Sequence, residues 1–192
     1  MLALAALGAS IAVGAMTALW ASQRWTRDSG LAVAIWPALV GTLAVLYANQ
    51  GDGAWARRSA IAWMMGSWGA RLAVQAIYTR AVHGPDEKGA ERPFWFFQAL
   101  AAAAVVGSLP AFLASFNRDP NLSIAELAAC ALWVVGFAGE TTADRQRLRF
   151  TSNPANQGLG CRTGVWRYSP YVDRIFEAMI WIAYAIFSVS SI

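Results

Sequence analysis

The residue that most requires a chemical explanation is Arg71, because it lies near the middle of a long apolar segment. An arginine at the centre of a membrane helix costs at least about 2.5–3.5 kcal/mol, so it needs a partner, a polar cavity or a bound anion. An ion pair with another helix and a contact with an anionic ligand or cofactor both remain open. Arg80 follows nine residues later. If one helix carries both arginines, they project to nearly opposite sides of it.

Acidic residues form the second set of candidates. If the helix that precedes residue 140 continues past the membrane, Glu140 and Asp144 share one face of it, with Arg147 below them. This pattern is typical of a solvated helix end held by ion pairs, and it also suits a basic groove for a phosphate-bearing cofactor. Glu177 lies just inside the last apolar segment, where an acid indicates a functional site unless it pairs with Arg174.

The segment from Asn153 to Ser169 combines glycines with Trp166 and Tyr168. Glycines permit a close approach of the backbone, and the two rings could stack on a ligand or anchor the segment at the membrane interface. The spacing does not form a Rossmann phosphate loop. The single histidine and two scattered cysteines predict no metal site and argue against a Ser-His-Asp triad.

Long apolar segments must position these residues. The chain is 57% hydrophobic and only 14% charged, whereas soluble domains carry roughly 25% charged residues. Runs of about 20 apolar residues are long enough to span a bilayer. We therefore expect an all-α, polytopic transmembrane helical bundle of about six membrane helices. The expected spans are 2–21, 31–48, 59–79, 94–116 with a break at Pro110, 122–139 and 175–192.

We treat residues 1–192 as a single membrane domain in which residues 140–174 form a cytoplasmic, motif-bearing loop. Eleven of the 15 Lys and Arg residues lie in loops that follow the first, third and fifth spans, and three follow the second and fourth. The positive-inside rule then predicts an integral, multi-pass protein of the cytoplasmic (inner) membrane with both termini outside. The net charge is +4, but the basic residues lie in loops between apolar spans, and this distribution argues against nucleic-acid binding. The first span lacks a basic leading region, so we interpret it as a helix and not a cleaved signal.

An ordered set of residues gives a more specific indication. It consists of Glu140, Asp144, Gln146, Phe150, Asn156, Gly158, Cys161, Gly164, Trp166, Arg167, Tyr168, Ser169, Phe176, Glu177 and Trp181. Further upstream are Trp68-Gly69-Ala70-Arg71-Leu72 with Arg80, and Phe96-Phe97-Gln98 with Leu109-Pro110. In this order the residues resemble the DUF1295 membrane proteins, which belong with the C-terminal family of the 3-oxo-5-alpha-steroid 4-dehydrogenases (steroid 5α-reductases). The resemblance covers most of residues 57–185.

The resemblance implies a fold of usually seven membrane helices and an NADPH-dependent oxidoreductase that acts on CH–CH groups. Its implied substrate is a lipid-like molecule, such as a steroid, with a C=C bond conjugated to a carbonyl. The implied cofactor-binding residues, around a cavity that faces the cytoplasm, are Arg71, Arg80, Glu140, Asp144, Asn156, Arg167, Tyr168, Asp173 and Glu177. Arginines would bind the phosphates, and carboxylates and amides would bind the ribose and nicotinamide. The partners are then the lipid bilayer and a hydrophobic small molecule; no catalytic residue is assigned.

Two other functions stay open. Asp173 stands where relatives keep Asn, Trp68 stands where steroid-reducing members carry a Tyr proton donor, and relatives continue beyond Ile192, so we expect a C-terminally shortened chain. These departures favour a non-catalytic family member that binds lipid or has a structural role. The other alternative is a methyltransferase similar to the isoprenylcysteine carboxyl methyltransferases, although their Arg-His-Pro signature does not occur here.

Overall fold

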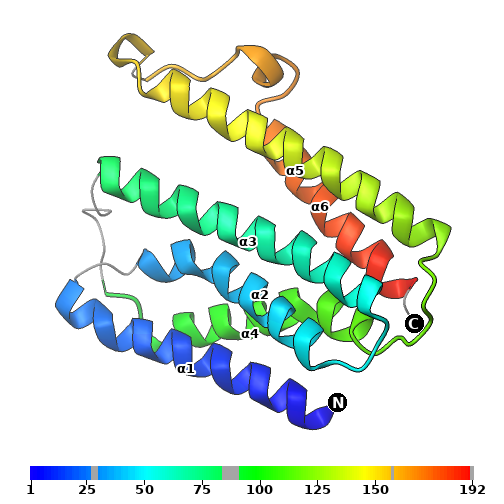
Figure 1. The fold of residues 1–192 in the computed structure, drawn as a ribbon. Helices are drawn as coiled ribbons and strands as arrows, with labels where there is room; N and C mark the ends of the chain where they lie inside the picture. The colour runs from blue at the N-terminus through cyan, green and yellow to red at the C-terminus, as the bar shows by residue number, and fades with distance from the viewer. Residues whose placement is uncertain (27–29, 84–90, 157, 191–192) are drawn as a thin grey trace. The chain divides into compact units, whose positions relative to one another are not determined.

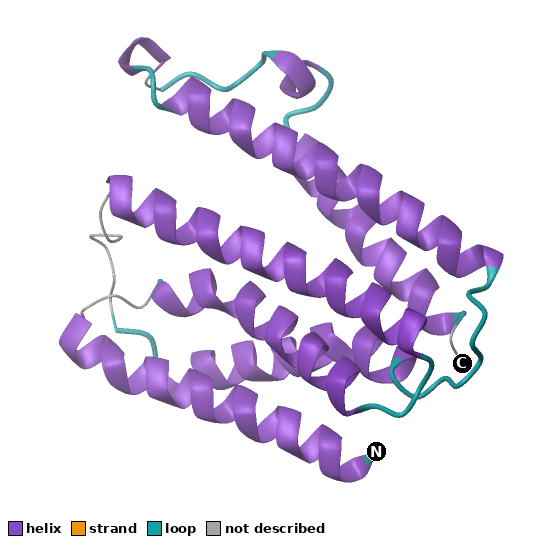
Figure 2. Cartoon of the chain, viewed as in Figure 1, coloured by secondary structure: helices purple, strands orange, loops and turns teal. Residues whose placement is uncertain are grey.

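The computed structural model describes residues 1–26, 30–83, 91–156 and 158–190. Within these residues the chain consists of six α-helices and two short 3-10 helices, with no β-strand (Figure 2). The chain divides into two compact units, Met1–Leu122 and Ser123–Ser190. The prediction of an all-α protein is thereby confirmed.

The first unit contains four helices, α1 (Leu2–Thr26), α2 (Leu31–Gln50), α3 (Trp55–His83) and α4 (Phe94–Ala114). Helix α2 packs against both α3 and α4, and α1 packs against α4 (Figure 1). Glycines let α2 and α3 approach closely: a Cβ atom on Gly69 would lie 2.3 Å from the carbonyl oxygen of Pro37. Small residues at helix contacts are typical of membrane bundles.

Prolines do not interrupt the helices of the first unit. Pro37 lies inside α2 and Pro110 lies inside α4, which continues to Ala114. The predicted break at Pro110 is therefore wrong. Membrane helices tolerate proline because neighbouring groups satisfy the carbonyl that loses its intrahelical partner.

The second unit is a helical hairpin of α5 (Ile124–Thr151) and α6 (Val172–Val189), with 3-10 helices η1 (Pro154–Asn156) and η2 (Gly164–Arg167) between them. Ser123 and Glu126 form a reciprocal capping box that begins α5. Gly139 makes room for α6, because a Cβ atom there would lie 2.3 Å from the ring of Phe176. Since α5 continues to Thr151, residues 140–151 of the expected loop are helical.

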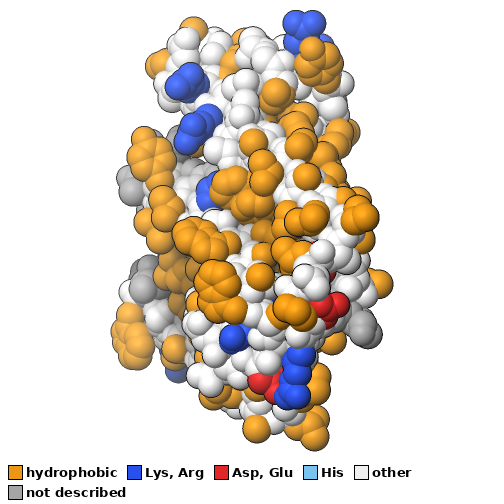
Figure 3. Space-filling view, turned by 45° about the vertical axis from the view of Figure 1, so that its right-hand side comes forward, with side chains coloured by type: hydrophobic (Ala, Val, Ile, Leu, Met, Phe, Trp, Pro, Cys, Tyr) orange, Lys and Arg blue, Asp and Glu red, His pale blue; other side chains and the backbone are white. Residues whose placement is uncertain are grey.

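In the part of the chain that the structure describes, four helices are long and apolar enough to cross a membrane: α1, α2, α4 and α5. Helix α3 contains Arg71 and Gln75, and α6 carries three charged residues, Asp173, Arg174 and Glu177, among its first six. Large hydrophobic side chains lie exposed on the helices, including Trp55 and Trp63, each 76% exposed. Figure 3 shows hydrophobic side chains over much of one face, with few charged groups among them. These features fit an integral, multi-pass membrane protein.

Candidate functional site

Two hydrogen bonds attach the loop between α5 and α6 to the surface of α5. The indole Nε1 of Trp166 donates to the carbonyl oxygen of Ala143 at 2.9 Å. The backbone N–H of Val165 donates to Oε1 of Gln146, also at 2.9 Å. Gly164 has a φ of +61°, and a Cβ atom there would lie 2.2 Å from the same Oε1. Only glycine fits this turn without strain, so the sequence around η2 is adapted to this attachment.

A small apolar cluster supports the attached loop. Ala143 of α5, Trp166 of η2 and Val172 of α6 are buried together, and Val165 and Phe176 pack against them. Burial of an aromatic side chain such as Trp166 contributes favourably because a large apolar area leaves water. The cluster therefore fixes the loop to both helices of the hairpin.

Beside the cluster lies a basic groove, which consists of two hollows that share Gly160, Cys161, Trp166 and Pro170. The larger hollow has a volume of about 590 Å³ and the smaller one about 280 Å³. Arg162 and Arg167 line the larger hollow and Arg147 lines the smaller. Small-molecule sites commonly measure about 300–1,000 Å³, so the basic groove is large enough for part of a phosphate-bearing ligand.

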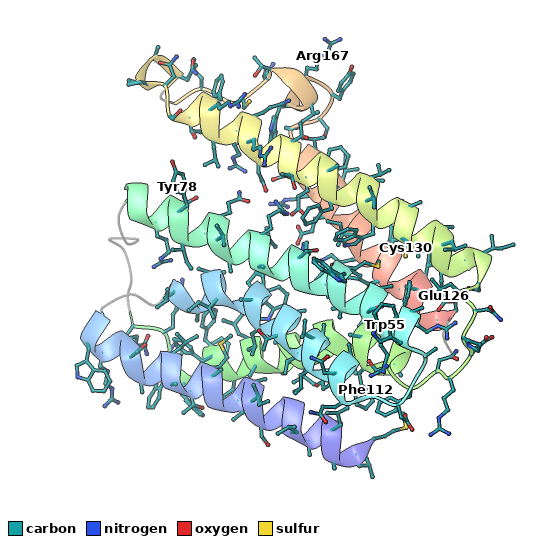
Figure 4. All side chains as sticks on the ribbon, in the orientation of Figure 1. Trp55, Tyr78, Phe112, Glu126, Cys130 and Arg167 are labelled. Atoms are coloured by element: carbon teal, nitrogen blue, oxygen red, sulfur yellow. The ribbon has the colours of Figure 1, made fainter. Side chains whose placement is uncertain are left out.

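The arginines of the basic groove contact aromatic rings. The guanidinium of Arg167 lies 5.1 Å from the ring centroid of Tyr168, and that of Arg147 lies 5.6 Å from the centroid of Trp166. Figure 4 shows Arg167 on the loop, with its side chain directed away from α5. Tyr168 is 78% exposed. Both residues therefore stand on the surface of the second unit, where a ligand could reach them.

Asn156 and Asp173 have structural partners within the second unit. The amide Nδ2 of Asn156 donates to the carbonyl oxygen of Phe150 at 2.9 Å, which closes the turn after α5. Asp173 lies in the first turn of α6, and its Oδ2 is 3.5 Å from Nη1 of Arg147. An acid in this position also interacts favourably with the helix dipole. The Asp173 carboxylate is thus placed at the edge of the basic groove.

Three predicted acids lie on the two long helices of the second unit. Glu140 and Asp144 are one turn apart on α5, as expected if the helix continues. Glu140 is only 6% exposed, and Glu177 of α6 is partly exposed. Arg174 stacks over the ring of Tyr171 at 5.8 Å, and among the described residues no ion pair joins it to Glu177. The second unit thus carries seven of the nine predicted cofactor-binding residues.

The remaining two residues, Arg71 and Arg80, belong to α3 of the first unit. Because one helix carries both, their nine-residue separation directs them to nearly opposite sides of α3. Nη1 of Arg71 donates to Oε1 of Gln75, one turn further along, at 3.4 Å. Both arginines are partly exposed.

Gln146 and Ala143 were not among the predicted site residues, although both hold the loop in place. Gln146 is part of the ordered motif, but nothing in its position along the chain indicates a hydrogen bond to Val165, 19 residues away. The Gly-x-Trp sequence at 164–166 is the signal that could have indicated a tight turn against a helix. This sequence does not identify which residues of the helix accept the hydrogen bonds.

The fold and the loop define a helical, multi-pass membrane protein with a basic groove in the connection before its last described helix. Residues 19–192 match the model of the DUF1295 family, which is described as a protein of unknown function. The chain belongs to the DUF1295 family. No curated protein and no solved structure matches the chain.

Proposed function

We propose that this protein is a membrane-embedded reductase that uses NADPH to reduce a C=C bond conjugated to a carbonyl in a lipid-like substrate. The observation that carries the proposal is the basic groove, because one of its three arginines, Arg167, belongs to the ordered motif that resembles the steroid 5α-reductase family. A dinucleotide with three phosphate groups requires several cations within a short distance, and arginine binds phosphate oxygens by paired, charge-assisted hydrogen bonds.

The residues of the second unit suit this cofactor. Arg162 and Arg167 line the larger hollow and would bind phosphate oxygens there. Glu140 and Asp144 are hydrogen-bond acceptors that would bind ribose hydroxyls or the carboxamide of nicotinamide. When bound, NADPH would supply a hydride to the β-carbon of the enone, and a proton taken up from water would complete the reduction at the α-carbon. The membrane helices would admit an apolar substrate from the bilayer and exclude bulk water from the reaction.

Binding of NADPH to the purified protein in detergent tests the proposal. Arg167→Ala is expected to weaken binding about tenfold, because it removes a charge-assisted hydrogen bond worth roughly 1.5 kcal/mol or more. Arg118→Ala is the matched control, since Arg118 is an exposed arginine of the first unit that pairs with Asp52. If the wild type and both variants bind NADPH equally, the basic groove does not bind the cofactor.

A second candidate is a family member that binds the cofactor or a lipid without catalysis. Trp68 favours it, because this side chain is fully buried against Trp36, with ring centroids 6.4 Å apart, and an indole is not a general acid. The two candidates differ in turnover. Oxidation of NADPH on addition of an enone lipid, with a reduced lipid as product, would exclude the non-catalytic function.

A further inference from the structure

A second groove, independent of the proposed reductase site, runs along the contact of α2 and α3 in the first unit. These helices lie side by side (Figure 1). The apolar part of the groove has a volume of about 460 Å³ and is lined by Val45, Ala62, Trp63, Gly66, Ser67 and Ala70. A Cβ atom on Gly66 would lie 3.3 Å from Cγ2 of Val45. The groove exists because four of the six residues that line it, Ala62, Gly66, Ser67 and Ala70, are small.

The groove continues toward a polar end near the start of α3. Ala62 and Trp63 also line an adjoining hollow of about 180 Å³, whose other lining residues include Asn49, Arg58 and Ser59. Trp55, labelled in Figure 4, lies at this end of α3 and also lines the hollow. An apolar channel with a cationic end is complementary to a phospholipid, which combines apolar acyl chains with an anionic phosphate.

Arg58 has an unused donor at this polar end. Its Nη1 donates to the carbonyl oxygens of Ala48 at 2.7 Å and Gly51 at 2.8 Å, which positions the guanidinium at the end of α2. Its Nε atom is buried and has no hydrogen-bond partner among the described residues. A buried donor without a partner is costly. A phosphate oxygen is an acceptor that would satisfy it and would match the charge.

The length of the groove agrees with the thickness of one leaflet. Arg58 and Ala70 are 12 residues apart on α3, which corresponds to about 18 Å along an α-helix. Half of the hydrocarbon core of a bilayer measures about 15 Å. We propose that the groove between α2 and α3 binds one acyl chain of a phospholipid whose phosphate is held at Arg58. The exposed ring of Trp63 packs along this chain.

A second copy of the protein is the competing occupant, because Ala62, Gly66 and Ala70 form a small-xxx-small pattern that also suits helix pairing. The charge at Arg58 disfavours it. In a symmetric dimer built on this face, the Arg58 guanidinium of each copy would approach its counterpart, and like charges repel at such distances. A phospholipid supplies the opposite charge.

Native mass spectrometry of the full chain in detergent tests the proposal with three probes: phosphatidylglycerol, a diacylglycerol with the same acyl chains, and inorganic phosphate. Phosphatidylglycerol is expected to bind more tightly than diacylglycerol, and inorganic phosphate is expected neither to bind nor to compete. Arg58→Gln should weaken the binding of phosphatidylglycerol about tenfold, since a charge-assisted hydrogen bond is lost. The binding of diacylglycerol should not change. Ala70→Leu should weaken the binding of both lipids, because the added side chain fills the groove.

Ala70 is exposed, so Ala70→Leu leaves the helix contacts intact even if Arg58→Gln impairs folding. Ala103→Leu is its matched control, because Ala103 is an exposed alanine of α4, and lipid binding should not change. Unchanged lipid binding by Ala70→Leu would overturn the proposal. So would equal affinity for the two lipids, binding of inorganic phosphate alone, or a dimer that Ala70→Leu dissociates.

Discussion

The indole Nε1 of Trp166 donates a hydrogen bond to the carbonyl oxygen of Ala143 at 2.9 Å, and only 7% of Trp166 is exposed. This bond joins the loop that carries Arg167 to the helix that carries Glu140 and Asp144. The positions of Arg162 and Arg167, the groove arginines on the loop, therefore do not depend on the loop backbone alone.

Trp166→Phe should loosen the loop without removing its apolar contacts. The variant keeps an aromatic ring in the cluster but loses the indole donor, so we expect a loss of about 1 kcal/mol in the free energy of unfolding. Hydrogen exchange of residues 159–170 should increase, and NADPH binding should weaken. Trp25→Phe is the control, because Trp25 is 83% exposed. Unaltered exchange in the Trp166 variant would show that the hydrogen bond does not fix the loop.

Gly164→Ala should be more disruptive than a glycine substitution elsewhere in the loop. Gly164 has a φ of +61°, and the added Cβ would collide with the side chain of Gln146. The left-handed conformation alone costs roughly 1–2 kcal/mol for a residue with a Cβ atom. The comparison is Gly160→Ala, since a Cβ atom there meets nothing within 4 Å. Thermal unfolding of the two variants gives the difference, and equal melting temperatures would contradict the described turn.

Asp173→Asn should strengthen NADPH binding. The carboxylate lies 3.5 Å from Arg147 at the edge of the basic groove, where it competes with phosphate for the guanidinium. Its replacement removes a negative charge and supplies an amide donor, so we expect about tenfold tighter binding. The lost ion pair is partly exposed and should cost less than about 1 kcal/mol of stability. Weaker binding by the variant would mean that the Asp173 carboxylate itself contributes to the cofactor site.

The ion pair of Asp52 and Arg118 joins the segment after α2 to the segment after α4. The hydrogen bond from Arg118 holds the pKa of the Asp52 carboxyl below its ordinary value of 3.8. A carboxyl with a lowered pKa stabilises the fold above its unfolded pKa, and this contribution is lost as the pH falls through the folded pKa. Thermal unfolding of wild type and Asp52→Asn should therefore converge below pH 3.8. A difference in melting temperature between the wild type and Asp52→Asn that persists unchanged at lower pH would contradict the ion pair.

The apolar segments were sufficient to predict the helices and the membrane environment, because hydrocarbon requires long runs of apolar residues. The extent of α5 was harder to predict. Residues 140–151 are polar and therefore resemble a loop, yet Arg, Gln and Leu within them favour helix. The break expected at Pro110 was wrong because helix contacts in a membrane bundle compensate for the missing N–H.

Within the candidate site, the ordered motif predicted which residues belong together but not what each one contacts. Asp173 illustrates the difference: the resemblance singles out its position in the motif, and only the structure brings Arg147 to its carboxylate. Similarly, the contact of Trp166 with Ala143 spans 23 residues and depends on the way the loop folds back on α5. Convergence of Arg71 with the acids of the second unit remains a prediction.

Equilibrium binding of NADPH to the purified, detergent-solubilised protein tests the central claim most directly. We expect saturable binding that S-adenosylmethionine does not displace and that Arg71→Ala and Glu177→Gln weaken, while Arg118→Ala leaves it unchanged. Absence of saturable NADPH binding, or tighter binding of S-adenosylmethionine, would contradict the assignment of this DUF1295 protein as an NADPH-dependent reductase.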